Sequence, residues 1–458
     1  MTDTKSVFLA KSQVKAQDLE HKRKLAFNIQ KYAETVVKGK QQFANLDLAR
    51  RRAKNVKWKT IERLDHYLEL FESNFTARGG KVIWAETNEE ALEAVLSICK
   101  AKNARQVVKS KSMVTEELHL NDFLAKHQIE SVETDLGEYI QQLDGEAPYH
   151  IVTPAMHKSK EDVARLFHEK LGVPPHLSPP ELTQIARQNL REKYQTADVG
   201  ITGGNFLLAD IGGVCVSENE GNGRLSTAFP KVQIAIVGIE KMLPSIKDLP
   251  LFWPLLATYG TGQNVTVYNT VFTGPKRPDE TDGPDEMYVI LLDNGRTNLL
   301  QRAEVREAMY CIRCGSCLNA CPVYKNIGGH AYGTTYSGPI GSVISPHLKG
   351  MDDFGHLSYA SSLCGNCTEV CPVKINIHEM LLANRQIAVS EGLAPFSESM
   401  SWKLWKRAML NKKLVNIAGA DIKTKVVATL FKKSWGAHRE DLKFARKSFQ
   451  QLWKERKS

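Results

Sequence analysis

The sequence contains no run of about 18 apolar residues, which is the length that a helix needs to cross a lipid bilayer. Its most apolar short stretch, residues 249–258, is too brief for this and contains two prolines. Residues 1–24 also lack the apolar core of a signal peptide. We therefore expect a protein that is neither inserted in a membrane nor exported.

Cysteine is scarce for a disulfide scaffold, because the 458 residues include only nine. Seven of the nine lie between Cys311 and Cys371, at spacings that are typical of metal ligands. The other two, Cys99 and Cys215, stand in apolar-rich segments, and we predict that both are buried core residues. This cysteine usage favours a reducing, cytoplasmic compartment.

Positive charge is unevenly distributed along the chain. The formal net charge is +10, and residues 401–458 alone carry 16 Lys or Arg against 4 Asp or Glu. We predict a helical tail that docks on a partner or on the anionic inner face of a membrane. The tail's charge and tryptophans would also suit phosphates and base stacking, but no DNA-binding motif is present, and nucleic acid is not an expected partner.

Four regions follow from the composition and from the spacing of apolar residues. Residues 1–75 have helical periodicity, and residues 76–299 alternate short apolar runs with amphipathic segments. Residues 300–395 hold the cysteine motifs, and residues 396–458 form the basic tail. The sequence therefore predicts an N-terminal helical region, two domains and a helical tail.

The second region has the strand-then-helix alternation of an α/β domain with a largely parallel sheet. Two later apolar runs, 264–274 and 286–293, are predicted as added edge strands or a hairpin. The other predicted strands are 81–86, 106–110, 129–134, 150–154, 197–202, 213–218 and 232–238.

The cysteines form two related motifs that are typical of iron–sulfur cubanes. Two-residue gaps let successive thiolates reach adjacent irons, and the last cysteine of each motif, followed by proline, reaches the other cluster. Gly315 and Gly365 let the backbone approach the sulfides closely. The spacing predicts a first [4Fe–4S] cluster held by Cys311, Cys314, Cys317 and Cys371, and a second held by Cys321, Cys364 and Cys367.

The second cluster has only three cysteine ligands, because position 361, where a complete motif would have a fourth cysteine, is Ser361. This cluster is either [3Fe–4S], or a [4Fe–4S] cluster whose fourth iron takes serine oxygen, water or a partner's side chain. Two zinc sites are the alternative for the whole module. Zinc motifs, however, usually pair CxxC units across longer gaps, so the unbroken first motif favours iron–sulfur.

The α/β domain offers weaker candidates for a ligand site. The paired glycines Gly203 and Gly204 follow a predicted strand and could present N–H groups to an anion, which Arg224 could clamp. Simple turn chemistry explains these glycines equally well. The stretch lacks both the dinucleotide fingerprint and the phosphate-loop lysine.

Two further candidates are groups of polar residues at strand ends. Residues 109–112 (Lys-Ser-Lys-Ser) could bind an anion or simply start a helix. Residues 133–138 place three carboxylates at a strand-to-helix junction, for catalysis or for favourable charge at a helix N-terminus. In the loop between the cysteine motifs, His330, Tyr332 and Tyr336 could face a cluster or a partner, or pack the small domain.

Together these segments resemble the lactate utilization protein B family. The resemblance covers most of the chain and includes the seven-cysteine pattern with its gap at Ser361. Its longest segments are 110–117, 133–140, 150–162, 202–225, 311–324, 330–341 and 364–373.

The resemblance implies a lactate-utilization α/β domain, similar to coenzyme A transferase and sugar-isomerase folds, joined to an α-helical ferredoxin-like two-cluster module. It also implies two companions, one similar to cysteine-rich heterodisulfide-reductase subunits and the other a lone lactate-utilization domain. Together such proteins oxidise L-lactate to pyruvate, and this chain would relay the electrons. Alternatively, it would be catalytic itself, with a hydroxy acid on an open iron of the second cluster and its carboxylate held by Arg224 or the lysines near position 110. The electron donor and the final acceptor stay open.

Overall fold

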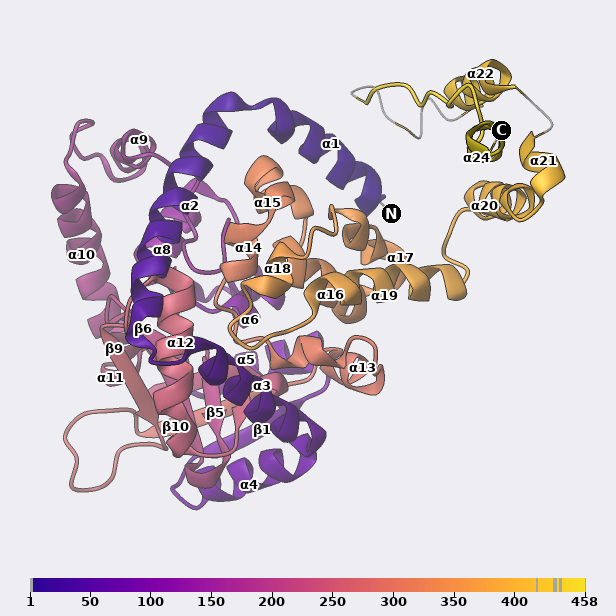
Figure 1. The fold of residues 1–458 in the computed structure, drawn as a ribbon. Helices are drawn as coiled ribbons and strands as arrows, with labels where there is room; N and C mark the ends of the chain where they lie inside the picture. Colours follow the sequence, from indigo (N-terminus) through magenta and orange to yellow (C-terminus); the bar gives the residue numbers. More distant parts are fainter. Residues whose placement is uncertain (1–2, 417–418, 431–434, 436–438, 458) are drawn as a thin grey trace. The chain divides into compact units, whose positions relative to one another are not determined.

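The computed structural model describes residues 3–416, 419–430, 435 and 439–457. The chain divides into two compact units, Met1–Ile387 and Ala388–Ser458 (Figure 1). In the part of the chain that is described, no helix is both long enough and apolar enough to cross a membrane.

The N-terminal region consists of helices, as its periodicity predicts. Helix starts are capped by side chains: Asp18 accepts a hydrogen bond from the backbone N–H of His21, and Asn45 accepts one from Leu48. Gly79 has a φ of 86°, a conformation that glycine adopts at little cost, and it ends the helical region. The helices are α1 (Thr4–Gln17), α2 (Leu19–Gly39), α3 (Leu46–Glu62) and α4 (Leu64–Thr76).

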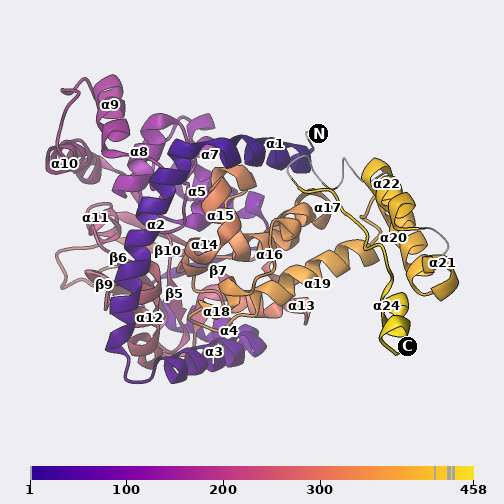
Figure 2. The same cartoon turned by 45° about the horizontal axis from the view of Figure 1, so that its top comes forward.

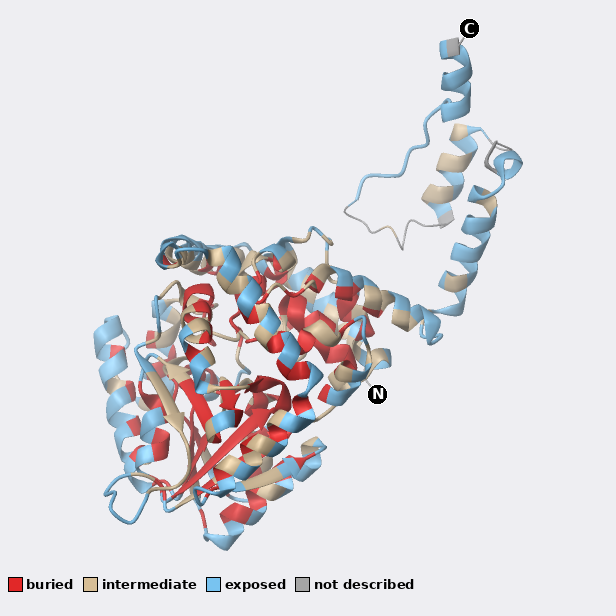
Figure 3. Ribbon diagram, turned by 60° about the horizontal axis from the view of Figure 1, so that its bottom comes forward, coloured by how far each residue is buried: buried red, intermediate tan, exposed pale blue. Residues whose placement is uncertain are grey.

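A six-stranded, fully parallel sheet forms the centre of the α/β domain, in the order β1-β10-β7-β4-β2-β3. Its middle strands are apolar and buried along their length, as expected for a parallel sheet covered on both faces (Figure 3). The strands are β1 (Lys81–Ala85), β2 (Gln106–Lys109), β3 (Glu130–Glu133), β4 (Val199–Thr202), β7 (Val232–Gly238) and β10 (Glu286–Leu292).

Two strand predictions are wrong. Residues 150–154 form a loop, because their apolar side chains pack beside Gly315 of the cysteine module instead of joining a sheet. The run 286–293 is neither an edge strand nor part of a hairpin, since β10 lies between β1 and β7 in the interior of the sheet. The prediction of an edge strand is confirmed for β9 (Tyr268–Phe272).

A second, four-stranded sheet has the order β8-β5-β6-β9. It combines antiparallel pairs with one parallel pair, between β5 (Phe206–Leu208) and β8 (Met242–Leu243). Neither of these two short strands was predicted, whereas β6 (Gly213–Glu218) was. Cys215 on β6 and Cys99 are fully buried, as predicted.

Helices cover both faces of the parallel sheet. On one face α5 and α7 pack apolar side chains such as Leu96 and Leu124 against Val107 and Ile234. At the β3 edge, α8, α9 and α10 form a separate apolar cluster. The helices of the domain are α5 (Asn88–Ala101), α6 (Met113–Glu117), α7 (Leu120–Lys126), α8 (Leu136–Asp144), α9 (Lys160–Leu171), α10 (Pro179–Thr196), α11 (Asn222–Ala228), α12 (Leu249–Thr261) and α13 (Arg296–Gln301).

The cysteine module is made of short helices and packs into the same core as the N-terminal helices (Figure 2). Arg50 of α3 donates to the carbonyl of Cys371 at 2.9 and 3.1 Å, and Lys54 pairs with Glu307 at 2.7 Å. The helices are α14 (Ser316–Ala320), α15 (Pro322–Ile327), α16 (Gly338–Lys349), α17 (Met351–Phe354), α18 (Asn366–Glu369) and α19 (Ile377–Ser390).

Short 3₁₀ helices lie in several of the connections. The described part of the tail is largely helical, as predicted. The 3₁₀ helices are η1 (Lys40–Gln42), η2 (Ala209–Ile211), η3 (Ile239–Lys241), η4 (Ile246–Asp248), η5 (Arg306–Tyr310), η6 (His330–Tyr332) and η7 (Gly355–Tyr359). The tail contains α20 (Phe396–Met409), α21 (Lys412–Asn416), α22 (Ala420–Leu430) and α24 (Phe449–Lys457).

Candidate metal centre and adjoining cavity

The seven thiols of the module gather in two sets. In the first, burial raises the pKa of Cys317, and the neighbouring thiols of Cys311, Cys314 and Cys371 raise it further. In the second, burial raises the pKa of Cys367 to about 11, with added contributions from Cys321 and Cys364. None of the seven is in a disulfide. We call them the first set and the second set.

The two motifs repeat one backbone conformation, fifty residues apart in number. Arg313 and Leu363 have left-handed φ angles of 59° and 55°, and Gly315 and Gly365 have 77° and 79°. The N–H of Arg313 donates to the Cys311 sulfur at 3.4 Å, and the N–H of Leu363 donates to the Ser361 hydroxyl at 3.1 Å. The Ser361 oxygen therefore stands where the repeat places a cysteine sulfur.

The residues present fit iron–sulfur clusters. Backbone N–H groups point at the sulfurs, as the groups that tune such clusters do. Tyr324 donates to Cys321 at 3.5 Å, and N–H bonds from Ile375 and Ser316 act to lower the pKa of Cys371 and Cys314. Burial nevertheless raises both pKa values, so binding of iron must displace the protons from these thiols.

The two sets differ in exposure. Cys314, Cys317 and Cys371 of the first set are each 8% exposed or less. In the second set Cys364 is exposed, and the N–H of Asn366 lowers the pKa of its thiol. Cys321 and Cys367 are as buried as these three, and Cys311 is partly exposed, so the sets differ mainly at Cys364, through which the second set reaches the protein surface.

A buried network of charges joins the first set to the α/β domain. Arg296 of α13 contacts Glu117 of α6 at 2.9 Å and Glu240 at 2.6 Å. The hydroxyl of Tyr336 donates to Glu117 at 2.6 Å, and the guanidinium of Arg313 lies 4.4 Å from the Tyr336 ring. Charges buried this deeply need such partners, so the network fixes the module against the sheet.

A cavity of about 540 Å³ lies between the sheet and the first set. It is lined by residues 110–112, 135–137 and 203–205, which come after the ends of β2, β3 and β4. Strand β2 leads to its neighbour β3 on one side, while β4 leads on to β7 on the other, so the cavity lies at a topological switch point. Cys314 lines its opposite wall. We call it the switch-point cavity.

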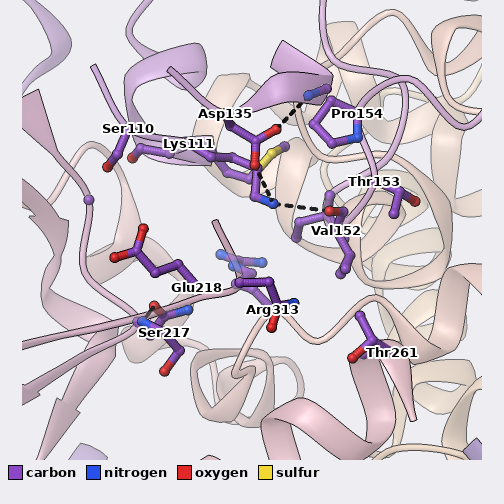
Figure 4. A pocket seen from close by; sticks show the side chains of 18 of the residues that line it. Ser110, Lys111, Asp135, Val152, Thr153, Pro154, Ser217, Glu218, Thr261 and Arg313 are labelled. Carbon is purple, nitrogen blue, oxygen red and sulfur yellow. Dashed lines mark hydrogen bonds and ion pairs between the residues drawn. The ribbon is translucent and has the colours of Figure 1, made fainter. Parts of the chain in front are cut away.

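The cavity is lined by charges of both signs. Lys111 lies 3.2 Å from Asp135 and donates to the Val152 carbonyl at 3.0 Å (Figure 4). Although burial opposes its charge, Asp135 raises the pKa of Lys111. Burial also raises the pKa of Glu218, whose carboxylate accepts the N–H of Arg224 at 3.0 Å.

Lys241 is the most unusual group in the wall. Burial, together with the charge of Arg313, lowers its pKa to about 8. The ion pairs of the neighbouring Glu240 are with Arg296 and Arg313. Its side chain is buried and lines the cavity, where the charges of Glu240 and Cys311 act to raise its pKa against the effect of burial.

The structure places only some of the predicted site residues in this cavity. Lys111, Asp135, Gly203 and Gly204 line it. Arg224 does not, because its exposed guanidinium lies over the Tyr268 ring at 5.3 Å.

The other predicted polar residues have structural partners. Lys109 is fully buried and pairs with Glu133 at 2.7 Å, with Glu138 3.9 Å away. Burial and the charge of Glu133 raise the pKa of Glu138 well above its ordinary value. His330 bonds the carbonyl of Ala147 at 2.7 Å. Tyr332 packs in the core with Tyr336.

Sequence reasoning missed Lys241 and Arg313. Arg313 stands inside the first cysteine motif, and that position was a signal that its side chain would lie beside the metal ligands. Lys241 follows a buried strand within a short 3₁₀ turn and belongs to no motif. Only the folded chain brings it to the cavity.

Comparisons with family models find two matching domains in the chain. A model described as "LUD domain" matches residues 68–292, and one described as "4Fe-4S dicluster domain" matches residues 307–375. The predicted fold, an α/β lactate-utilization domain joined to a ferredoxin-like module, is confirmed. A crystal structure of a DUF162 family protein from Deinococcus radiodurans matches 50% of this chain and 98% of its own, at 14% identity and a TM-score of 0.28.

Several curated relatives share one name, "Lactate utilization protein B". That of Bacillus cytotoxicus is 45% identical over 83% of this chain and 80% of its own. That of Bacillus licheniformis is 47% identical over 79% and 76%, respectively. That of Geobacillus thermodenitrificans is 48% identical over 77% and 75%.

Proposed function

The chain belongs to the lactate utilization protein B family, and from this premise we propose that it relays electrons in the oxidation of L-lactate to pyruvate. The observation that carries the proposal is the arrangement of the two thiol sets. The first lies beside the switch-point cavity and the second reaches the surface at Cys364. Electrons from a buried donor would need such a path to an external acceptor.

We propose that the two thiol sets hold two clusters, whose chemistry when bound is one-electron transfer. The chain's own groups hold the thiolates in place and exclude water. N–H donors such as those of Arg313 and Tyr324 stabilise thiolate charge, and the cations near Cys311 do the same at longer range. The proposed ligands are Cys311, Cys314, Cys317 and Cys371 for the first cluster, and Cys321, Cys364 and Cys367 for the second.

For the second cluster we propose that Ser361 supplies the fourth ligand, which favours [4Fe–4S] over [3Fe–4S]. The support is the repeated backbone, in which the Ser361 hydroxyl accepts the same N–H bond as the Cys311 sulfur. A serine oxygen binds a proton more tightly than a thiol does, so this ligand is the weakest of the four.

The proposal also includes two companion proteins. A cysteine-rich subunit similar to heterodisulfide reductases and a lone lactate-utilization domain would supply the missing steps of lactate oxidation. The basic tail, with exposed Trp402 and Trp405, suits docking on an acidic companion or on the anionic cytoplasmic face of a membrane.

The alternative is a chain that is catalytic itself, through a hydroxy acid bound at an open iron of the second cluster. Among the described residues, no cysteine of the second set lines the switch-point cavity, whereas Cys314 of the first set does. This placement favours electron relay over catalysis at an open iron of the second cluster.

The test is low-temperature electron paramagnetic resonance of the anaerobically purified chain. L-lactate is added first, then the companions, and finally dithionite. We expect no cluster reduction by lactate alone and full reduction by dithionite. Reduction that appears with lactate only when the companions are present supports the relay. Reduction by lactate alone makes the chain itself the catalyst.

A further inference from the structure

Three side chains of the kinds that bind transition metals meet at a place that neither thiol set uses. They are Glu146 and His157, from the loop between α8 and α9, and His330, at the start of η6. One ligand atom of each lies within 4.8 Å of a ligand atom of the other two. Segments far apart in the sequence thus meet where the α/β domain contacts the cysteine module. We call these three residues the histidine site.

The hydrogen bond of His330 leaves one of its ring nitrogens ready for a metal ion. Its Nε2 lies 2.7 Å from the carbonyl oxygen of Ala147, and a carbonyl can only accept, so Nε2 carries the proton. In the neutral ring Nδ1 is then an acceptor without a proton. Histidines that bind metals commonly have this arrangement, in which a backbone carbonyl holds the second nitrogen and fixes the orientation of the ring.

His157 supplies a second imidazole in a fixed orientation. Its ring stacks on that of Tyr149, with centroids 4.3 Å apart, and its Nε2 lies 3.0 Å from a carboxylate oxygen of Glu146. Its Nδ1 is buried and has no hydrogen-bond partner among the described residues. Buried polar atoms without a partner are uncommon in folded proteins, so the hydrogen bonds within the site do not satisfy both nitrogens of this ring.

The carboxylate of Glu146 can turn to a metal ion without leaving a charge alone. It lies 3.0 Å from the ammonium of Lys158, which also pairs with Asp144. Two carboxylates thus share one ammonium, and the group has one negative charge in excess. A divalent cation beside Glu146 is attracted by this excess, while Lys158 keeps Asp144 as its partner.

An ion can reach the histidine site from solvent. His157 lines a second cavity, of about 310 Å³, between α2 and α9, and exposed residues such as Arg165 and Glu169 line it as well. The ligand atoms of a tetrahedral zinc site are about 3.4 Å apart. His157 and Glu146 are already close to this spacing, and small side-chain rotations bring in His330.

We propose that Glu146, His157 and His330 bind one divalent first-row transition-metal ion, with water in the remaining position. Two imidazoles and one carboxylate are ligands that zinc takes at sites with an open position. The site uses none of the seven cysteines of the module, and it does not depend on the electron relay proposed above. By linking the loop after α8 to η6, the ion fastens the α/β domain to the cysteine module.

Zinc is the probe, because a site of this kind binds zinc more tightly than Mn²⁺ or Fe²⁺. Zn²⁺ is titrated into the anaerobic full chain after reconstitution with iron and sulfide, so that the thiols are occupied. X-ray absorption at the zinc edge then measures the ligand distances. We expect one zinc per chain, with nitrogen and oxygen ligands at about 2.0–2.2 Å and no sulfur at about 2.3 Å. No bound zinc at micromolar concentrations, or zinc bound through sulfur, overturns the proposal.

Matched variants locate the site. Glu146→Gln removes the carboxylate at nearly the same size and at an exposed position, and His330→Gln removes a ligand from the cysteine module. Each should weaken zinc binding, measured against a competing chelator, by more than about a hundredfold, because even indirect partners of a bound metal contribute tenfold to a hundredfold. His176→Gln, an exposed histidine of the same domain as Glu146, is the control and should bind as the wild type does. Unchanged affinity in either ligand variant contradicts the proposal.

Thermal unfolding tests whether the ion fastens the two domains. A ligand that binds only the folded chain stabilises it, so one equivalent of zinc should raise the melting temperature of the wild type and leave that of Glu146→Gln unchanged. An equal rise in both places the zinc elsewhere and overturns the inference.

Discussion

The two thiol sets share one backbone motif and one hydrophobic core, but they differ in the exposure of one thiol and in the charges beside them. The first lies in the main hydrophobic core, beside Arg313 and Lys241, and is braced by the buried Arg296 network. The second has an exposed thiol in Cys364 and a serine in its fourth position. Because burial, net charge and hydrogen bonds to sulfur set cluster potentials, we expect the two proposed clusters to differ in potential through their surroundings and not through the motif that they share.

The largest expected difference is in stability. Cys317→Ala removes a proposed ligand that is 8% exposed and part of the core, so we expect it to lose the proposed first cluster and to lower the free energy of unfolding by more than about 3 kcal/mol. Cys364→Ala removes an exposed ligand and should lose the second cluster at a smaller cost. Iron analysis and chemical denaturation under argon measure both.

Cys99→Ala serves as the control for this pair, since it removes a buried thiol outside the module. It should keep all its iron. Equal destabilisation by Cys317→Ala and Cys364→Ala would show that burial does not distinguish the two sets.

The second-largest expected effect is also on stability, and it concerns the buried Arg296 network beside the first set. Arg296→Met leaves Glu117 and Glu240 buried without their main partner, so we expect a loss of about 3–5 kcal/mol of stability. The control, Arg51→Met, breaks the exposed pair with Asp47 and should cost less than about 1 kcal/mol. Differential scanning calorimetry compares the two variants, and similar losses would argue against the brace.

A smaller effect on stability is expected from acid, through His21 of α2. His21 is buried against the Tyr149 hydroxyl, and burial lowers its pKa to about 4, below the ordinary 6.5. Between these values the unfolded chain binds the proton more tightly, so stability falls as the pH drops from 6.5 towards 4.

His21 should therefore contribute at most about 2 kcal/mol to the loss of stability between pH 7 and pH 5. His21→Gln should flatten the pH dependence of denaturant unfolding, and the exposed His176→Gln should leave it unchanged. An unaltered slope in His21→Gln would contradict the assignment.

The smallest effect on stability, and the sharpest on spectra, is expected from the fourth position of the second set. Ser361→Cys completes the repeat and should give the second cluster the resonance of an all-cysteine [4Fe–4S] centre at unchanged unfolding free energy. Ser361→Ala should favour loss of one iron and a [3Fe–4S] signal. Identical spectra for Ser361→Ala and wild type would exclude the serine ligand.

Much of the architecture could be predicted from local pattern. Apolar runs and amphipathic segments identified most strands of the parallel sheet and helix α5, because these features depend on neighbours in sequence. The close grouping of the seven cysteines also follows from spacing. Which cluster each thiol binds stays a prediction.

The failures share a cause, which is contact between distant segments. Residues 150–154 have the composition of a strand, but their partner is the Gly315 turn and not a sheet. Nothing in residues 286–293 indicates that β10 inserts between β1 and β7. Lys241 and Arg313, some seventy positions apart in number, likewise become neighbours only in the folded chain.

The loop at residues 150–154 has a consequence for maturation in the cell. A Cβ atom on Gly315 would come within 3.1 Å of Ile151 and Val152, so the loop is pressed against the turn that carries Cys314 and Cys317. Cys317, which is 8% exposed, therefore offers little surface to a scaffold protein that delivers iron and sulfide. We therefore expect the proposed first cluster to assemble before this loop packs against the turn, and the second set, open at Cys364, to accept iron in the folded protein as well.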